Sequence, residues 1–219
     1  WPIVVLALLA IGLNACMLSV IYGLLAKPLP YPAQERLVTL DLRSDKMGID
    51  LGWSVPFFEA ASDQDGLQQV AAFKTSEAVL LSSAGERVGE VEAITAQPAL
   101  FSLLGLNATA GRVLNDTDSL PGMPCHIVVS EDFWERRFGK RFEDGRRLKV
   151  DEKDCMIVGT VPSRSGFPEP SRQLWMPLVL TEEDRALSEA GSFGDLHAVG
   201  RLAVGRSELD ATREMMRRI

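Results

Sequence analysis

Residues 126–161 read HIVVSEDFWERRFGKRFEDGRRLKVDEKDCMIVGTV, and their pattern decides the fold class. The apolar run at 126–129 predicts a short buried strand, and Ser130 is placed to cap the helix EDFWERRFG that follows it. Two further strands are expected at 147–150 and 155–161, on either side of a polar turn. A strand, a helix and a strand pair in this order indicate a mixed α+β fold.

The rest of the chain after residue 35 continues this alternation of strands and short helices. We expect strands at 36–42, 70–74, 77–82, 87–95, 174–179 and 197–204, with a hairpin turn at 84–86. Helices are predicted after the caps Ser54 and Ser207, and from Pro98 to a stop at Gly105. Their apolar faces are predicted as Phe57, Phe58 and Ala61 in the first, and Leu209, Met216 and Ile219 in the last.

Residues 1–26, WPIVVLALLAIGLNACMLSVIYGLLA, carry no charged side chain. As a helix this run reaches roughly 39 Å, which exceeds the hydrocarbon core of a bilayer at about 30 Å. We therefore predict a transmembrane helix at 1–26. Two other interpretations stay open: a buried core helix, and a signal peptide cleaved after Ala26.

Small residues follow one stripe of this predicted helix at three- and four-residue spacing, namely Gly12, Cys16, Ser19 and Gly23. Such a stripe lets a second membrane helix approach closely, and Asn14 near mid-span would favour a polar partner there. The stripe indicates a helix that packs in a multi-helix membrane unit, although an Ala- and Gly-rich helix can also show it by chance.

All 23 basic and 30 acidic residues lie after residue 26 and give a net charge of −7. This acidic balance argues against nucleic acid as a partner, because nucleic-acid binding needs a basic face. Of the three cysteines, only Cys125 and Cys155 lie outside the apolar run. Neither is part of a CxxC or Cys/His cluster, so zinc is not expected; a disulfide outside the cytoplasm and two separately buried thiols both remain open.

The sequence offers little for catalysis, and we predict no enzyme activity, no catalytic or cofactor-binding residue and no metal site. The two histidines, His126 and His197, each begin an apolar strand, and Walker A, GxGxxG and HExxH motifs are absent from the sequence. Residues 115–118 (NDTD) resemble a loose calcium loop, but a solvated turn explains them better.

Basic residues are densest after the helix at 131–139. A solvated helix end and loop is the first interpretation, and contact with anionic lipid headgroups or a partner protein is the other. The residues concerned are Arg136, Arg137, Lys140, Arg141, Arg146 and Arg147.

Read in order, several segments resemble the MacB/FtsX-type ABC transporter permeases, closest to the branch of large orphan permeases abundant in acidobacteria. The exit LLAKPLPYPAQERLVTL is similar to the family's "LLRPLPYP…RLV", and QPALFSLLGLNATAGRVLNDTD to its "F-F-x-x-L-G-x-x-P-x-x-G-R", with Ala108 near the usual proline. HIVVSEDFWERRFGK, LKVDEKDCMIVGTVPSRSGFP and LWMPL resemble "VV-L-S-x-x-x-W-x-R-x-F-G", "V-V-G-V-x-P" and "LW-x-P-L". GWSVPFFEAASDQDGLQQVAAF resembles "S-x-x-D-F-x-x-W…F…A-A-F" without its later tryptophan.

The resemblance implies a periplasmic core of two α/β subdomains between the first two membrane helices. Residues 36–105 and 197–219 would form a split porter-like subdomain, 106–180 the inserted second subdomain and 181–196 a connecting segment. A proline-rich exit linker at 27–35 would join them to the membrane helix, and further membrane helices would follow residue 219. Pro28, Pro30 and Pro32 would stiffen that exit, although a plain helix stop explains them too.

The function that the resemblance implies is mechanotransmission. ATP hydrolysis by a separate ATP-binding subunit in the cytoplasm would drive periplasmic movement or export, with the permease in the bacterial inner membrane and its soluble domain in the periplasm. Partners would be the membrane, that subunit, a second permease in a homodimer, and a periplasmic or outer-membrane protein. The alternative is a membrane-tethered periplasmic sensor or scaffold that binds a partner or ligand without transport.

Overall fold

The computed structural model describes residues 1–5, 11–15, 17, 31–44, 49–63, 65–163, 167–169, 171–189 and 194–218. The chain divides into two units, Trp1–Gln34 and Glu35–Ile219. In the first unit, residues 2–5 and 11–15 are helical. None of the described helices is long and apolar enough to cross a membrane. Most of the predicted membrane helix, with Cys16, Ser19 and Gly23, lies outside the described residues and stays a prediction. Pro28 and Pro30 of the predicted exit linker lie outside them too.

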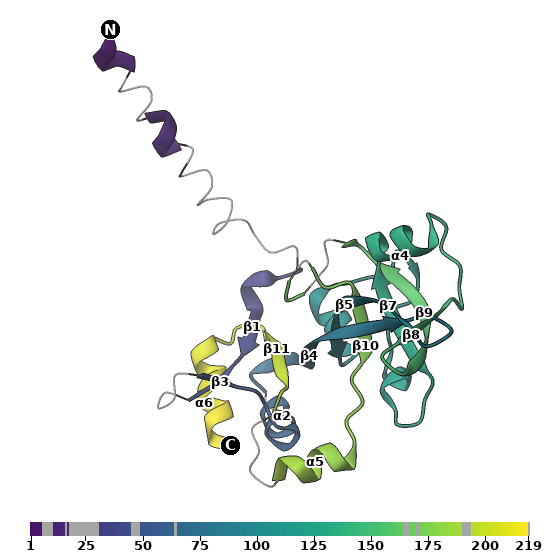
Figure 1. Ribbon diagram of the computed structural model, residues 1–219. Helices are drawn as coiled ribbons and strands as arrows, with labels where there is room; N and C mark the ends of the chain where they lie inside the picture. Colours follow the sequence, from purple (N-terminus) through teal and green to yellow (C-terminus); the bar gives the residue numbers. More distant parts are fainter. Residues whose placement is uncertain are drawn as a thin grey trace. The chain divides into compact units, whose positions relative to one another are not determined.

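The second unit is a mixed α+β fold, as predicted, and Figure 1 shows its elements. Its strands are β1 (Leu37–Leu40), β2 (Leu42–Ser44), β3 (Ile49–Leu51), β4 (Leu67–Leu81), β5 (Arg87–Ala96), β6 (Ala110–Gly111), β7 (Cys125–Ser130), β8 (Arg147–Val150), β9 (Lys153–Val161), β10 (Leu174–Pro177) and β11 (His197–Leu202). Its helices are η1 (Gln34–Arg36, which begins at the unit boundary), α2 (Val55–Ser62), α3 (Ala99–Leu104), η2 (Asp116–Ser119), α4 (Glu131–Phe138), α5 (Glu182–Glu189) and α6 (Glu208–Arg218).

In the described part, nine strands form one sheet in the order β1-β11-β4-β5-β10-β7-β9-β6, with β8 between β9 and the far end of β4. The β10–β5 and β7–β9 pairs are parallel and the others are antiparallel. Because β8 pairs with both β9 and β4, six strands close into a ring: β4, β5, β10, β7, β9 and β8. The second unit therefore contains a small barrel continuous with an open sheet.

The long strand β4 joins these two parts. Its first half pairs with β11 in the open sheet, and its last residues, Leu80 and Leu81, pair on the same edge with β8 of the barrel. Two short strands at 70–74 and 77–82 were predicted here, and the structure corrects them to one strand of 15 residues. Thr75 and Ser76, which lie between the two predicted strands, stay in the ladder opposite Ile94 and Ala93.

The barrel has its own hydrophobic core, built from alternate residues of each strand as the two-residue period of a strand requires. Phe133 and Trp134 of α4 pack against these side chains. The strand residues are Ala78, Leu80, Val91, Ala93, Ile127, Val129, Leu148, Val150, Cys155, Ile157 and Leu174.

A second core lies where α2 and α6 meet the open sheet, and its members include Leu40, Trp53, Phe58, Leu196 and Ala211. Two details of the predicted helix faces are wrong. In α2 the buried residues are Val55, Phe58 and Ala61, whereas Phe57 is 46% exposed.

In α6, Ala211 is buried and Met215 partly buried, whereas Leu209 and Met216 are 58% and 72% exposed. Helix α6 thus turns a different side to the core, and Ile219 lies outside the described residues. The predicted subdomain boundaries at 105/106 and 180/181 stay a prediction. Four residues of the predicted porter-like segment 36–105 contribute to the barrel core, namely Ala78, Leu80, Val91 and Ala93.

The three predicted helix caps differ in what they do. Ser130 accepts a hydrogen bond from the Phe133 N–H at 3.2 Å, and Ser207 accepts one from Asp210 at 3.2 Å. Ser54 occupies the cap position of α2, yet its buried hydroxyl has no hydrogen-bond partner. Gly105 ends α3 in the left-handed conformation, at φ 67°, as predicted.

We expect Ser130→Ala to lower the free energy of unfolding by about 1 kcal/mol, because the Phe133 N–H loses its acceptor in a buried setting. Ser54→Ala is the matched control and should change it by less than about 0.5 kcal/mol, since no cap bond is lost. Urea denaturation of both variants measures the difference. Equal losses in the two variants would contradict the assignment.

Candidate functional site

A hollow of about 460 Å³ lies beside the start of α3. Helix α2 contributes Phe58 and Ser62, the loop after η2 contributes Leu120 and Pro121, and the chain after β10 closes another side. A further hollow of about 400 Å³ lies on the other side of Pro98 and Ala99. The first hollow is lined by Phe58, Ser62, Val70, Gln97, Pro98, Ala99, Asp116, Ser119, Leu120, Pro121, Leu178 and Leu180.

The lining of the first hollow is mainly apolar, with polar groups only on part of its wall. Leu120 is 53% exposed, and Met123 in the same loop is 44% exposed, so this wall presents apolar side chains to solvent. Gln97 is held in place because its Oε1 accepts a hydrogen bond from the Ala72 N–H at 2.9 Å. A concave, mainly apolar surface of this size suits an apolar side chain of a partner or a small organic ligand.

The loop that forms this wall is fixed by a buried carboxylate, Asp118, whose side chain is only 3% exposed. Arg112 donates two hydrogen bonds to it, from Nη1 to Oδ2 at 2.6 Å and from Nη2 to Oδ1 at 3.0 Å. The Asn115 N–H donates to Oδ2 at 2.8 Å, and Asn115 Oδ1 accepts from the Asp118 N–H at 3.3 Å. This reciprocal pair is a capping box on η2.

His126 completes this group, with its Nδ1 lying 2.6 Å from Asp118 Oδ1 and 3.3 Å from Arg112 Nη2. An ionised carboxylate only accepts, so His126 Nδ1 must carry the proton of its bond to Asp118. Guanidinium nitrogens only donate, so the contact of the protonated Nδ1 with Arg112 is not a second hydrogen bond. Burial alone would raise the pKa of Asp118, but the hydrogen bonds from Arg112, the Asn115 backbone and His126 lower it to about 2. Asp118 is therefore a charged structural anchor at neutral pH.

The interpretation of residues 115–118 as a solvated turn holds for Asn115, Asp116 and Thr117, which are exposed, but is wrong for Asp118. Asp116 is exposed, but Asp118 is buried and its two carboxylate oxygens bond Arg112 and His126. In the described part of the chain, no three His, Cys, Asp or Glu residues are grouped so that they could hold a metal ion. His126 acts here as a hydrogen-bond donor in a structural cluster.

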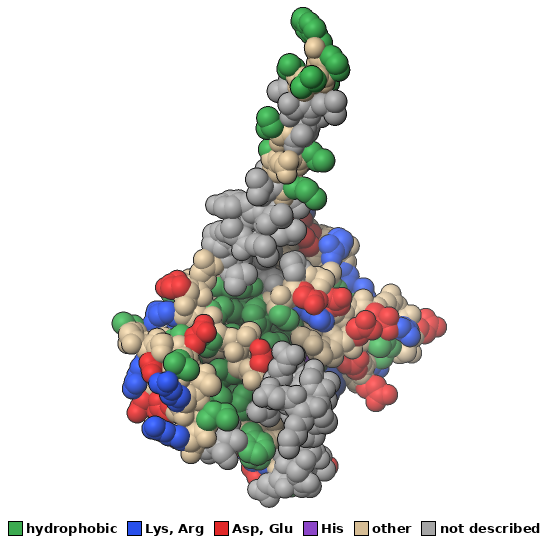
Figure 2. All heavy atoms as spheres, turned by 90° about the vertical axis from the view of Figure 1, so that its left-hand side faces the viewer, with side chains coloured by type: hydrophobic (Ala, Val, Ile, Leu, Met, Phe, Trp, Pro, Cys, Tyr) green, Lys and Arg blue, Asp and Glu red, His purple; other side chains and the backbone are tan. Residues whose placement is uncertain are grey.

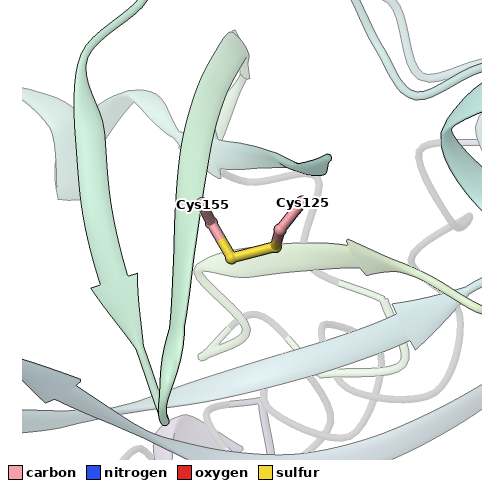
Figure 3. The surroundings of a disulfide bond; sticks show 2 residues. All are labelled: Cys125 and Cys155. Atoms are coloured by element: carbon pink, nitrogen blue, oxygen red, sulfur yellow. A yellow bond between two sulfur atoms is a disulfide. The ribbon is translucent and has the colours of Figure 1, made fainter. Parts of the chain in front are cut away.

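Cys125, the residue before His126, forms a disulfide with Cys155 (Figure 3). The two cysteines are directly opposite each other in the parallel β7–β9 ladder, with their Cα atoms 4.5 Å apart. Of the two arrangements left open by the sequence, the structure has the disulfide. Cys155 is fully buried in the barrel core and Cys125 packs against that core, so the bond ties two strands of the barrel together.

The basic residues 136–147 are all exposed. Arg136 donates to Gln173 Oε1 at 2.8 Å, and Arg146 lies over the Phe138 ring, 5.1 Å from its centroid. These contacts fit the interpretation as a solvated helix end and loop; contact with lipid or a partner stays a prediction. His197, the other histidine, stacks at a tilt on Phe73, with ring centroids 5.5 Å apart.

Two glycines of the quoted motifs allow β6 to approach β9. A Cβ on Gly111 would lie 2.3 Å from the Val158 carbonyl oxygen, and its φ of +67° also favours glycine. A Cβ on Gly159 would lie 2.2 Å from the Arg112 carbonyl oxygen. This close approach places Arg112, which follows Gly111, where it can reach Asp118.

The sequence matches the MacB-like periplasmic core domain over residues 4–213. The chain belongs to this family. No curated protein matches it significantly in sequence. This membership supports the family resemblance drawn from the motifs at the level of the MacB-like periplasmic core domain. The acidobacterial branch stays a prediction.

Three solved structures share the fold of this MacB-like domain. The periplasmic region of MacB from Actinobacillus actinomycetemcomitans has a TM-score of 0.60 at 13% identity, covering 83% of this chain and 80% of that chain. The extracellular domain of the noncanonic ABC-type transporter YknZ from Gram-positive bacteria has 0.57 at 15%, covering 83% and 91%. A domain of a protein described as a permease, from Porphyromonas gingivalis, has 0.57 at 17%, covering 86% and 87%.

The sequence did not lead us to predict that Arg112 binds Asp118, or that the loop with Leu120 and Pro121 lines a hollow. Arg112 was part of the quoted "G-R" motif, but a motif does not say which carboxylate an arginine reaches. His126 was noted only as a strand-end residue. A loop acid with asparagine three residues before it is a capping signal, and that signal could have predicted that Asp118 turns inward.

Proposed function

We propose that this chain is the periplasmic part of an ABC-type permease of the MacB/FtsX class, within the branch of large orphan permeases abundant in acidobacteria. Membership of the MacB-like periplasmic core domain family over residues 4–213 is the observation that carries the proposal. The domain couples ATP hydrolysis by a separate cytoplasmic subunit to movement or export in the periplasm. It has no catalytic activity of its own.

The architecture suits a part that transmits force. A closed six-stranded ring with a cross-strand disulfide resists bending, because every barrel strand is hydrogen-bonded on both sides. The strand β4 connects this ring rigidly with the open sheet that carries α2 and α6. In this proposal, residues 1–26 span the inner membrane, and the prolines after Lys27 pass helix motion to the domain.

The test follows motion of the domain in the full-length permease with its ATP-binding subunit, in nanodiscs. Nitroxide labels on Arg137→Cys, an exposed residue of α4, report the distance between two permeases of a dimer, in a Cys16→Ala background. We expect that distance to differ between the nucleotide-free state and the ATP-bound state. An unchanged distance during continuing ATP hydrolysis would contradict mechanotransmission.

In the same system, Pro28→Gly combined with Pro30→Gly should uncouple ATP hydrolysis from the movement of the periplasmic domain. ATP hydrolysis continues while the nucleotide-dependent change in distance shrinks to less than about half, because glycine removes the fixed φ that stiffens the exit. Pro124→Gly, at an exposed position outside both hollows, is the matched control and should behave as the wild type. Full coupling in the double variant would show that the prolines only end a helix.

A second function, a tethered sensor or scaffold that binds a ligand or partner without transport, is favoured by the apolar hollow beside α3. The nucleotide experiment separates the two functions. A sensor would bind its ligand with no dependence on an ATP-binding subunit.

A further inference from the structure

The net charge of this protein is concentrated in the segments that form the first hollow, beside α3. Residues 55–66, 93–107, 113–124 and 177–184 contribute every lining residue of this hollow except Val70. These segments hold eight of the 30 acidic residues and none of the 23 basic ones, which leaves 22 acidic and 23 basic residues in the rest of the chain. The surface around the hollow is therefore negatively charged, whereas the remainder of the chain is close to neutral.

Five exposed carboxylates form an acidic rim at this hollow. Asp116 lines the hollow itself, and the other four lie within three residues of a lining residue. Arg185 donates from Nη2 to Glu59 Oε1 at 2.9 Å and from Nη1 to Glu182 Oε1 at 2.7 Å, which holds the start of α5 beside α2. Within the described residues, Asp116 and Glu183 form no ion pair. The acidic rim consists of Glu59, Asp63, Asp116, Glu182 and Glu183.

The wall of the hollow that follows η2 is a rigid turn with apolar side chains on its outside. The Met123 N–H donates to the Leu120 carbonyl oxygen at 3.3 Å, and between them lie a proline and Gly122 at φ +80°, the residue pattern of a type II turn. Asp118 anchors the chain before this turn, and the disulfide anchors it afterwards. The backbone therefore loses little conformational entropy when a partner covers Leu120 and Met123, which are both exposed.

The apolar side chains exposed on α6 are in a different electrostatic setting. Leu209 and Met216 share this helix with Asp210, Arg213 and Arg217, so both signs of charge are present. Figure 2 shows the side of the domain that carries α6, where basic and acidic side chains both lie between hydrophobic ones. Nothing on that side selects the charge of a partner, whereas the segments around the first hollow carry acidic residues alone.

We propose that the first hollow binds an apolar side chain from a basic segment of a partner protein, and that lysine or arginine residues of this segment face the acidic rim. A central apolar anchor with charged residues at its edge is typical of a protein–protein contact. The acidic rim is distributed over the α2, η2 and α5 regions, and Met123 extends the apolar surface outside the hollow, so the contact is larger than one small molecule covers. This contact rests on the binding role proposed above for the hollow, and it does not depend on transport.

The probe is a fluorescein-labelled ten-residue peptide with one central phenylalanine between two pairs of lysines, titrated with the full chain in micelles of an uncharged detergent. We expect saturable binding by fluorescence anisotropy with a Kd below about 1 mM. Alanine in place of the phenylalanine should weaken binding at least about tenfold, because the apolar anchor is lost. Glutamine in place of the lysines should weaken binding at least about fivefold and remove its dependence on salt.

A matched pair of double variants tests the acidic rim. Asp116→Lys combined with Glu183→Lys should weaken binding of the basic peptide at least about tenfold, and a peptide with glutamates in place of the lysines should then bind. Glu86→Lys combined with Glu152→Lys makes the same change in net charge at exposed positions outside the hollow. This control should leave the affinity within about twofold of the wild type, because the charges at the contact are unchanged.

A second matched pair tests the apolar wall. Leu120→Ala should weaken binding at least about fivefold, because it removes an apolar side chain that lines the hollow. Val88→Ala, at a similarly exposed position on β5 outside the hollow, should have no effect. Both side chains are exposed, so neither substitution should unfold the domain.

Three results would overturn the proposal. They are no saturable binding up to about 1 mM, equal binding of the peptide without phenylalanine, and equal weakening by the two lysine double variants, which would indicate attraction by net charge alone. Equal binding of the glutamine peptide would keep the hollow as a binding site and overturn the basic partner. None of these results affects mechanotransmission, because the nitroxide distance tests it without any peptide.

Discussion

Replacement of both barrel cysteines, Cys125→Ala with Cys155→Ala, is expected to lower the free energy of unfolding by about 3–4 kcal/mol. The bond closes a loop with a sequence separation of 30, and its loss restores the conformational entropy of that loop in the unfolded chain. For a domain of this size the loss corresponds to a fall in Tm of about 10 °C. Thermal unfolding followed by circular dichroism measures it.

Reductant provides the internal comparison. Dithiothreitol should lower the Tm of the wild type toward that of the double variant and leave the double variant unchanged. Cys16→Ala is the matched control, because Cys16 lies outside this disulfide, and it should not alter the Tm of the domain. A wild-type Tm that does not respond to reductant would indicate two separately buried thiols instead.

The second large effect is expected at Asp118. Asp118→Ala should cost about 2–3 kcal/mol, because it leaves the Asn115 N–H and His126 without their acceptor. Arg112 is 41% exposed and can be solvated again, which keeps the loss below that of a fully buried pair. Urea denaturation at pH 7 measures the change, with Asp116→Ala, an exposed neighbour, as the control that should stay within about 0.5 kcal/mol.

The same carboxylate makes stability depend on acid pH. Its folded-state pKa of about 2 lies below the ordinary value of 3.8, so its contribution is fully present above about pH 4. Protonation removes that contribution as the pH falls from about 4 to about 2, and the loss is about 2 kcal/mol. Asp118→Asn should flatten the stability curve in this window. An identical acid profile for wild type and variant would refute the assignment.

The contacts of several residues in the quoted motifs show what these residues do in the structure. Gly111 permits the close approach of β6 to β9, and Arg112 directly after it reaches Asp118. Ser130 begins α4, and Trp134 donates its indole N–H to the Arg141 carbonyl oxygen at 3.2 Å. The quoted motif residues thus hold the barrel and the loop beside it.

The sequence by itself determined the local elements of this protein. The Ser130 and Ser207 caps and the Gly105 stop predicted what the structure shows, because each depends on interactions within a few residues. Strand periodicity placed most strands of the sheet but divided β4 into two. The order of motifs also predicted the MacB-like family. The transmembrane helix at 1–26 and the subdomain boundaries remain predictions.

Only the tertiary structure decided how distant segments meet. The closure of six strands into a ring depends on β8 pairing with β4, which are about 70 residues apart in the chain. The disulfide and the choice of side that α6 turns to the core depend on that same packing. The burial of Asp118 follows from contacts with Arg112 and His126 on other elements. Long-range pairing leaves no local pattern, since its free energy comes from burial and hydrogen bonds that exist only after the chain has folded.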